Sequence, residues 1–359
     1  MAAITAAMVK ELREMTGAGM MDCKKALNEC DGNMEAAVEF LRKSGAAKME
    51  KKASRIAAEG IARVAVSGNA AVVAEVNSET DFVAKNETFQ EFVQLVADNA
   101  LASGLNGGKN GEDIDALLEM NGLKEVLIEK TATIGEKLSV RRFEKVTGEC
   151  VASYLHAGGK IGVLVAAEGT ADAKEALTNV AMQVAAMNPQ YISRDDISAE
   201  ALDKIREITV DSSLNDTPSL PKPILNALIE KAISEKVWSD EDIAIFEEKK
   251  TNMNFVWNFM SKEAPAQLAG LAMADKENIL ANKIFAGLVD GRIAKQLKDI
   301  CLMDQVYVKA EDGKQTVAAY LKSVNNALKI TKIVRFEVGE GMEKKNEDFA
   351  AEVAKQMNA

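Results

Sequence analysis

Few side chains in this sequence are spaced as catalytic or metal-binding motifs require. His156 is the single histidine, which nearly excludes a multi-histidine metal site and leaves one candidate for acid–base chemistry, without a serine or cysteine partner by motif. A GxxxxGK[ST] phosphate loop and a dinucleotide-binding fingerprint are both missing. The cysteines are far apart and unpatterned, at Cys23, Cys30, Cys150 and Cys301. We therefore expect no zinc site, disulfide framework or cofactor.

One polar segment stands out because of its place between two predicted elements. A strand is predicted to end at Asn77, and Thr80-Asp81-Phe82-Val83-Ala84-Lys85 leads from it into a helix. Taken alone, these residues predict a helix N-cap at Thr80 or Asp81. They also predict that Phe82 belongs to the protein's own core.

The charge of the chain favours a protein partner over a nucleic acid or a membrane. The net charge is −11 over 359 residues, which argues against binding through phosphates or anionic lipids. The segment from Arg42 to Arg55 is basic, and we interpret it as a solvated helical linker rather than an RNA contact. The N-terminus lacks the pattern of a signal peptide, and no apolar run is long enough for a spanning helix. We expect a cytoplasmic protein.

The hydrophobic periodicity predicts an α+β fold. Residues 1–54 are expected to form a three-helix N-terminal module and its linker. Residues 55–146 are expected to form the first half of a core, with a hairpin around Ser67-Gly68-Asn69, a glycine-rich surface loop at 104–111 and a helix at about 113–131.

The hairpin-then-helix order returns after residue 147, which indicates a weak internal duplication. We assign 147–197 and 301–344 to the second half of the core, again an antiparallel sheet packed with helices. Residues 198–300 are expected to leave this half as a helical, coiled-coil excursion. A last helix is expected at 345–359.

The excursion has an unusual insert at about 212–272. It includes nearly continuous apolar residues, namely Met253, Phe255, Val256, Trp257, Phe259 and Met260. Two interpretations remain open for them. They either fold back as an extra helical layer or form an oligomer or partner surface.

Several long motifs of the sequence resemble those of the elongation factor Ts family. They are Val9-Lys10-Glu11-Leu12-Arg13, the run from Thr16 to Leu27, Glu75-Val76-Asn77 with Thr80 to Lys85, Ile161 to Val165, and Val334 to Gly341. The motifs occur in order from the first predicted helix to the last predicted strand. The resemblance covers roughly residues 1–200 and 275–359.

The resemblance implies a guanine-nucleotide exchange factor that binds elongation factor Tu, both GDP-bound and nucleotide-free, and performs no covalent chemistry during translation elongation. It implies that Thr80, Asp81, Phe82 and Val83 dislocate magnesium from the partner. The family's excursion usually serves dimerisation or partner docking. A homodimer through residues 198–300 is therefore a further expectation.

Other partner contacts are implied by position. Arg13, Met20 and Met21 match the family's N-terminal contact with the partner, although either methionine can instead belong to the core of the small helical module. His156 lies in the second hairpin, where it contacts another partner domain or is simply a solvated polar residue. Phe349 and Val353 of the last helix dock on the partner or pack on the chain's own core.

Two other classes of function compete with this interpretation. The N-terminal module resembles ubiquitin-associated domains, so the chain can be a binding or chaperone module for which residues 60–359 are dispensable. An enzyme using His156 is the other class, and it requires that substituting this residue abolishes turnover. The lack of a second catalytic motif makes it remote.

Overall fold

A computed structural model describes residues 4–343 of the chain. It is a mixed α+β structure made of two compact units. The first unit comprises residues 1–188 and 307–359, and the second comprises Pro189–Val306. The expected last helix, with Phe349 and Val353, lies outside the described residues.

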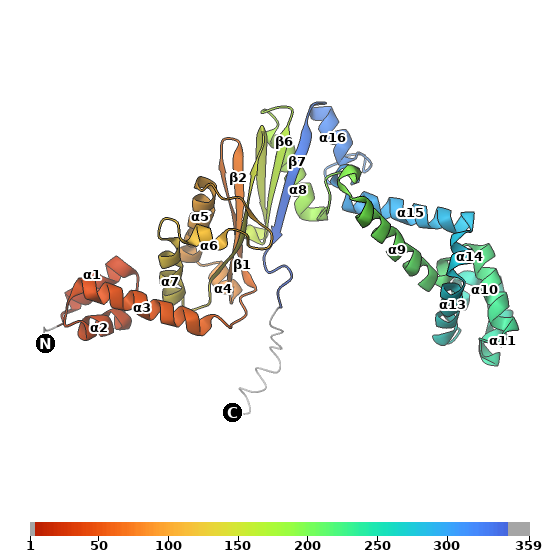
Figure 1. Cartoon of the computed structure of the whole chain (residues 1–359), viewed down its shortest axis with the longest axis horizontal. Coiled ribbons are helices and arrows are strands. Elements are labelled where there is room, and N and C mark those ends of the chain that lie inside the picture. Colours follow the sequence, from red (N-terminus) through yellow and green to blue (C-terminus); the bar gives the residue numbers. More distant parts are fainter. Residues whose placement is uncertain (1–3, 344–359) are drawn as a thin grey trace. The chain divides into compact units, whose positions relative to one another are not determined.

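Three helices open the first unit (Figure 1): α1 (Ala6–Thr16), α2 (Met20–Glu29) and α3 (Met34–Lys52). The Thr5 and Asn33 side chains cap α1 and α3 by accepting hydrogen bonds from backbone N–H groups. Gly17 ends α1 with a φ of 64°, a left-handed conformation that glycine adopts without strain. The three helices enclose a small core of their own around Leu12, Cys23 and Leu27.

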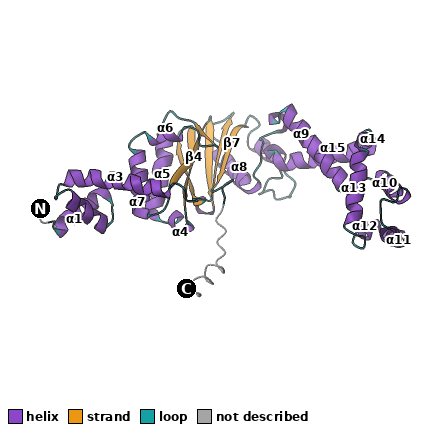
Figure 2. Cartoon of the chain, turned by 60° about the horizontal axis from the view of Figure 1, so that its bottom comes forward, coloured by secondary structure: helices purple, strands orange, loops and turns teal. Residues whose placement is uncertain are grey.

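Between residues 4 and 343, seven strands form two antiparallel sheets: β1 (Glu59–Ser67), β2 (Ala70–Ser78), β3 (Gly107–Gly108), β4 (Ser139–Thr147), β5 (Cys150–His156), β6 (Ile161–Glu168) and β7 (Lys329–Glu337). The first sheet has the order β1-β2-β4-β3, and the second has the order β5-β6-β7. Buried residues from both sheets, among them Val73, Leu164 and Phe336, form one cluster. Helices cover the outer faces (Figure 2).

The helices of the first sheet are α4 (Asp81–Ala84), α5 (Glu87–Ala102), α6 (Ile114–Leu118) and α7 (Leu123–Ile134). The apolar face of α5, including Phe89, Phe92 and Val96, is buried with the inner side chains of β2 and β4. The second sheet is covered by α8 (Lys174–Met187), and α16 (Val317–Val324) precedes β7. A short 3-10 helix, η1 (Ala157–Gly159), connects β5 and β6.

One expectation for the first sheet is wrong, and another is incomplete. The helix expected at about 113–131 is broken, because Asn121 and Gly122 have φ values of 52° and 70° and so leave the right-handed helical region. The segment 104–111 is a surface loop as expected, but it also contains β3, whose two glycines pair with Phe143 and Glu144 of β4. Neither the break in the helix nor the short strand has a signal in hydrophobic periodicity alone.

The second unit is built of helices, apart from its loops and one isolated β-bridge between Tyr191 and Cys301. Its elements are η2 (Arg194–Asp196), α9 (Ala199–Asn215), η3 (Thr217–Ser219), α10 (Lys222–Ser234), α11 (Asp240–Lys249), η4 (Lys250–Asn252), α12 (Met253–Val256), α13 (Glu263–Ala274), α14 (Lys276–Leu280), α15 (Lys283–Ile300) and η5 (Leu302–Asp304). A hydrophobic cluster built around Leu228, Trp238 and Phe285 belongs to this unit alone.

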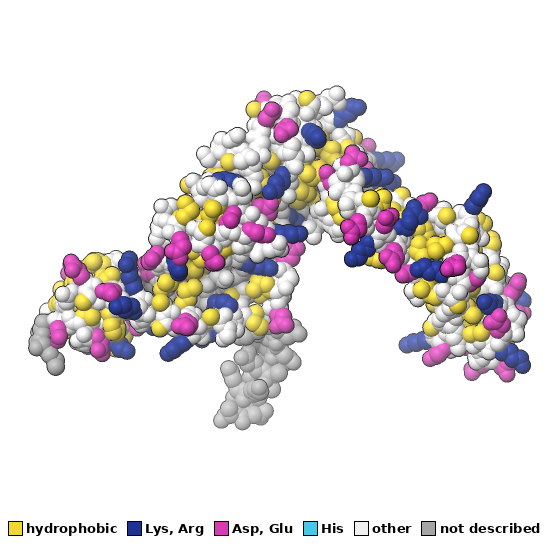
Figure 3. Space-filling model, in the orientation of Figure 1, with side chains coloured by type: hydrophobic (Ala, Val, Ile, Leu, Met, Phe, Trp, Pro, Cys, Tyr) yellow, Lys and Arg dark blue, Asp and Glu magenta, His cyan; other side chains and the backbone are white. Residues whose placement is uncertain are grey.

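The apolar run in the insert divides between the helical core and the protein surface, which confirms the first interpretation in part; the second, an oligomer or partner surface, stays a prediction. Val256 and Met260 are buried, so the run contributes a layer to the helical core. Phe255 and Phe259 are 58% and 56% exposed, and the Lys249 ammonium lies 4.7 Å from the centre of the Phe259 ring. Charged side chains of both signs are interspersed on the face shown in Figure 3.

Candidate functional site

The Thr80–Val83 turn sits directly after β2 and contains the first residues of α4. Thr80 is the N-cap, as predicted, and its Oγ1 accepts a hydrogen bond from the Val83 N–H at 3.4 Å. Val83 packs against the core, and Ala84 is buried. Successive helical residues point in different directions, so this arrangement leaves Phe82 facing outward.

Phe82 is 79% exposed, so the prediction that its ring belongs to the protein's own core is wrong. The hydrophobic residues around it fill the core without it, which explains why the ring stays outside. Such high exposure of a large aromatic ring leaves most of its apolar surface in water and has to be explained by something other than packing.

A salt bridge flanks the ring on the same turn. The Lys85 ammonium lies 2.7 Å from an Asp81 carboxylate oxygen and 5.9 Å from the centre of the Phe82 ring. The hydrogen bond from Lys85 lowers the pKa of Asp81, and the positive charge of Lys160 acts in the same direction. The turn therefore presents an apolar ring beside a neutralised pair of charges.

The β5–β6 hairpin comes close to the same region. Lys160, directly after η1, forms an ion pair of 2.5 Å with Glu59 at the start of β1. A side chain at Gly159 would meet the Ala62 carbonyl at 2.7 Å, so glycine is required where the hairpin crosses β1. The structure thus brings the Thr80–Val83 turn and the hairpin that carries His156 together around β1.

His156 ends β5 and is exposed. Its Nδ1 lies 3.2 Å from the Tyr154 hydroxyl. No group of histidine, cysteine, aspartate or glutamate side chains within residues 4–343 is arranged to hold a metal ion. The Tyr154 hydroxyl is the side-chain hydrogen-bond partner that the structure gives this exposed ring.

Arg13, Met20 and Met21 lie apart from the turn, on α1 and α2. Met20 and Met21 are 60% and 77% exposed, so the interpretation that either belongs to the module's core is wrong. Leu12, Cys23 and Leu27 occupy that core instead. Arg13 is also exposed. These residues are available for contact with another molecule.

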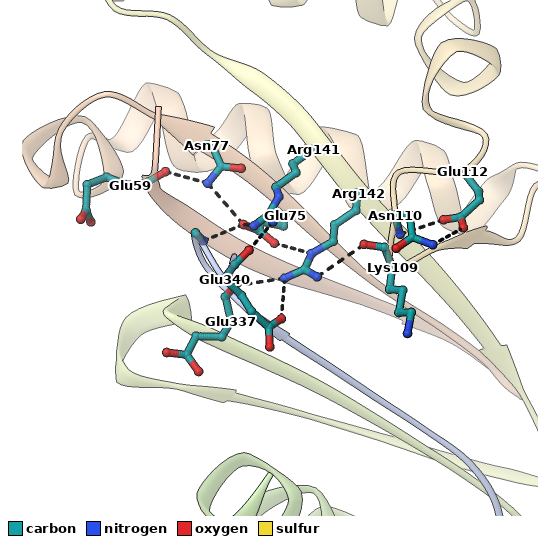
Figure 4. Close-up of polar contacts among 11 residues, drawn as sticks. Glu59, Glu75, Asn77, Lys109, Asn110, Glu112, Arg141, Arg142, Glu337 and Glu340 are labelled. Atoms are coloured by element: carbon teal, nitrogen blue, oxygen red, sulfur yellow. Dashed lines mark hydrogen bonds and ion pairs between the residues drawn. The ribbon is translucent and has the colours of Figure 1, made fainter. Parts of the chain in front are cut away.

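A buried charge cluster fixes the end of β2 that leads into the turn (Figure 4). Glu75 has no exposed surface, and its carboxylate accepts hydrogen bonds from Arg142 Nε at 2.6 Å and Arg141 at 2.9 Å. It also accepts a hydrogen bond from the Gly339 N–H at 2.9 Å. Arg142 donates to the Glu337 carbonyl, and its guanidinium lies 4.2 Å from the centre of the Phe336 ring. The cluster joins β2 and β4 to the end of β7.

A second polar cluster holds the turn itself, and the sequence gives no indication of it. The Glu136 carboxylate, between α7 and β4, accepts hydrogen bonds from the N–H groups of Glu79 and Thr80, each at 3.0 Å. Glu136 also accepts a hydrogen bond of 2.7 Å from the Thr80 hydroxyl. These residues are more than fifty positions apart, so no local spacing indicates the contact.

Comparison with known proteins decides the family. The model of the family described as "Elongation factor TS" matches residues 79–250 and 257–340. A protein named "Elongation factor Ts" from Clostridioides difficile (strain 630) is 44% identical over 370 aligned residues, covering 99% of this chain and 100% of the relative. The chain belongs to the elongation factor Ts family.

As a member of the elongation factor Ts family, the chain is a guanine-nucleotide exchange factor for elongation factor Tu and acts in translation elongation in the cytoplasm. It is not an enzyme. Within the described residues, no helix is both long and apolar enough to cross a membrane. The family match includes most of the 212–272 range, with residues 251–256 between its two parts.

Proposed function

We propose that Phe82 acts as a wedge that displaces magnesium from GDP-bound elongation factor Tu, with Thr80, Asp81 and Val83 presenting it. The observation that supports this proposal is the 79% exposure of Phe82 on a turn whose other residues are anchored. Burying such a ring in a partner gains about 2 kcal/mol from apolar surface alone. A rigid turn lets that energy act on the partner instead of on ordering the factor.

The partner's metal is the vulnerable point in this mechanism. Magnesium requires near-octahedral geometry at short distances. A ring inserted beside it displaces ligands, and the nucleotide then loses the charge that matched its phosphates. The coupling is reciprocal, so GDP weakens binding of the factor as much as the factor weakens binding of GDP. Differential affinity of ~5.5 kcal/mol inverts a 1:99 population.

Stopped-flow release of a fluorescent GDP from elongation factor Tu tests the wedge. Phe82→Ala should slow release at saturating factor by on the order of tenfold or more, while affinity for the nucleotide-free partner falls less. Leu95→Ala, which shortens a 40% exposed leucine of α5, is the matched control and should behave as the unsubstituted chain. Equal losses of rate and affinity for Phe82→Ala would make Phe82 an anchor only.

We further propose that Arg13, Met20, Met21 and His156 contact elongation factor Tu, together with Phe349 and Val353. Support comes from the exposure of the first four residues. Their role is binding, so each alanine variant should raise the dissociation constant of the complex and leave the rate at saturation nearly unchanged. A changed rate at saturation, with unchanged affinity, would contradict that role.

A homodimer through the helical excursion is proposed on the exposure of Phe255 and Phe259. Sedimentation should show a concentration-dependent dimer that Phe255→Ser with Phe259→Ser dissociates. A monomer at all concentrations would leave this surface to another partner.

A further inference from the structure

The Thr80–Val83 turn, which carries Phe82, is too short to hold its own conformation. α4 has four residues, and a single helical turn is unstable in isolation because nucleation fixes several dihedral angles for one hydrogen bond. An exposed ring on such a turn would sample many directions. The contacts that restrict it must therefore come from elsewhere in the fold.

Those contacts are reciprocal hydrogen bonds that two glutamates, Glu136 and Glu79, accept from each other's segments. The Glu136 side chain accepts hydrogen bonds from the backbone of Glu79 and Thr80, at 3.0 Å each, and from the Thr80 hydroxyl at 2.7 Å. In return, a Glu79 carboxylate oxygen accepts a hydrogen bond of 2.6 Å from the Lys137 N–H. The Glu136 carboxylate thus holds the segment after β2, and the Glu79 carboxylate holds the segment between α7 and β4.

These hydrogen bonds continue into the linker that follows α3. Arg55 donates to Glu79 at 3.1 Å, and the Lys137 ammonium donates to the carbonyls of Ala53 and Arg55 at 2.7 and 2.9 Å. The end of β2, the α7–β4 junction and the linker are therefore joined through five side chains, those of Glu79, Thr80, Glu136, Lys137 and Arg55. Glu136 is the member that contacts the turn directly.

We propose that Glu136 is the positioning residue for Phe82, in that its carboxylate fixes the Thr80 cap and so the direction of the ring. This inference rests on the proposed function of Phe82. Hydrogen bonds to an ionised carboxylate are about twice as strong as neutral ones. Without them, only a fraction of molecules presents the ring correctly, and the effective exchange rate falls by that fraction.

The test compares exchange by the full chain carrying Glu136→Ala, Glu136→Gln or the control Glu91→Ala, which removes an exposed glutamate from α5. Glu136→Ala should slow GDP release at saturating factor by about tenfold, the loss expected for hydrogen bonds to a charged group. Glu136→Gln should recover much of the rate, because its amide oxygen still accepts both backbone N–H groups. Glu91→Ala should leave the rate unchanged.

A double-mutant cycle with Phe82→Ala separates positioning from loss of stability. If Glu136 acts through the ring, adding Glu136→Ala to Phe82→Ala should slow release no further. Equal effects of Glu136→Ala in both backgrounds would overturn the proposal, as would an unchanged rate with Glu136→Ala alone. Thermal unfolding of each variant verifies that the compared proteins are folded.

The cycle also separates this proposal from the one on which it rests. If Phe82→Ala exchanges GDP as fast as the unsubstituted chain, the wedge itself fails. If Phe82→Ala is slow and Glu136→Ala is fast, the wedge stands and the positioning role of Glu136 fails.

Discussion

Glu75 shows how much a single side chain can connect in this molecule. It accepts hydrogen bonds from two arginines, the Asn77 amide and a backbone N–H beyond β7. Arg142, its closest partner, has only 7% of its side chain exposed. A buried ion pair of this kind costs desolvation to form but is costly to break from one side, because the remaining charge stays in the interior.

Glu75→Ala should therefore lower the free energy of unfolding by about 3–5 kcal/mol, since it removes the buried carboxylate bound to Arg142 Nε and leaves Arg142 only the half-exposed Glu340 carboxylate at 3.2 Å. Urea unfolding followed by far-UV circular dichroism measures the change. Glu311→Ala, at an exposed position of the same unit, should change the free energy by less than about 0.5 kcal/mol. A loss below about 1 kcal/mol for Glu75→Ala would mean that water replaces the carboxylate.

Among elements, the junction between α11 and α13 depends on one carboxylate. Asp242 is 4% exposed and accepts hydrogen bonds from the Ser261 N–H, the Ser261 hydroxyl and the Ser239 hydroxyl, at 2.7, 2.8 and 2.9 Å. Burial raises the pKa of Asp242, but the hydrogen bonds from Ser261 and Ser239 outweigh it, and the pKa lies below its ordinary value. Trp238 packs nearby, donating from its indole to the Ala264 carbonyl at 3.0 Å.

The lowered pKa predicts an acid-sensitive helical unit. The stabilisation by Asp242 is complete above the ordinary pKa of an unfolded aspartate, and it is lost as the pH falls through the lower folded value. Tryptophan fluorescence during heating should show that Asp242→Asn lowers the midpoint at pH 7 and that the gap to the unsubstituted chain narrows below about pH 4. A gap that is independent of pH would contradict the assignment.

The secondary structure around the site is largely predictable from the sequence, but the long-range hydrogen bonds that hold the turn in place are not. A helix cap at Thr80 or Asp81 is predictable because threonine or aspartate before an apolar run has a local signature, and the structure selects Thr80. The hairpin β1–β2 followed from the alternation of valines around Gly68. The reciprocal hydrogen bonds of Glu79 and Glu136 and the cluster around Glu75 depend on residues that the fold brings together. Such contacts have no period in the sequence, so only the structure shows them.

For the whole molecule, the two units have separate hydrophobic clusters, and both tryptophans, Trp238 and Trp257, belong to the second unit. In the first unit, the two sheets approach closely at Gly162, where an added Cβ would lie 2.7 Å from a Val73 methyl group. A disturbance at Gly162 should remain within the first unit.

Gly162→Val should overpack the two sheets and cost about 2 kcal/mol, or roughly 6 °C in unfolding temperature. Calorimetry should show this shift for the first unit, while the transition seen by tryptophan fluorescence stays in place. Leu268→Ala, at a buried position of the helical cluster, is the reciprocal control and should shift only the fluorescence transition. Joint movement of both transitions would show that the units unfold cooperatively.

The order of strands in the second sheet has a consequence for biosynthesis. β6 ends at Glu168, and its partner β7 begins only at Lys329, with about 160 residues between them. At ~5–20 residues per second, a ribosome needs roughly 10–30 s to deliver β7 after β6 has emerged. The nascent chain carries an unpaired strand edge throughout this interval. The self-contained helical unit, made during the same interval, is free to complete its own folding first.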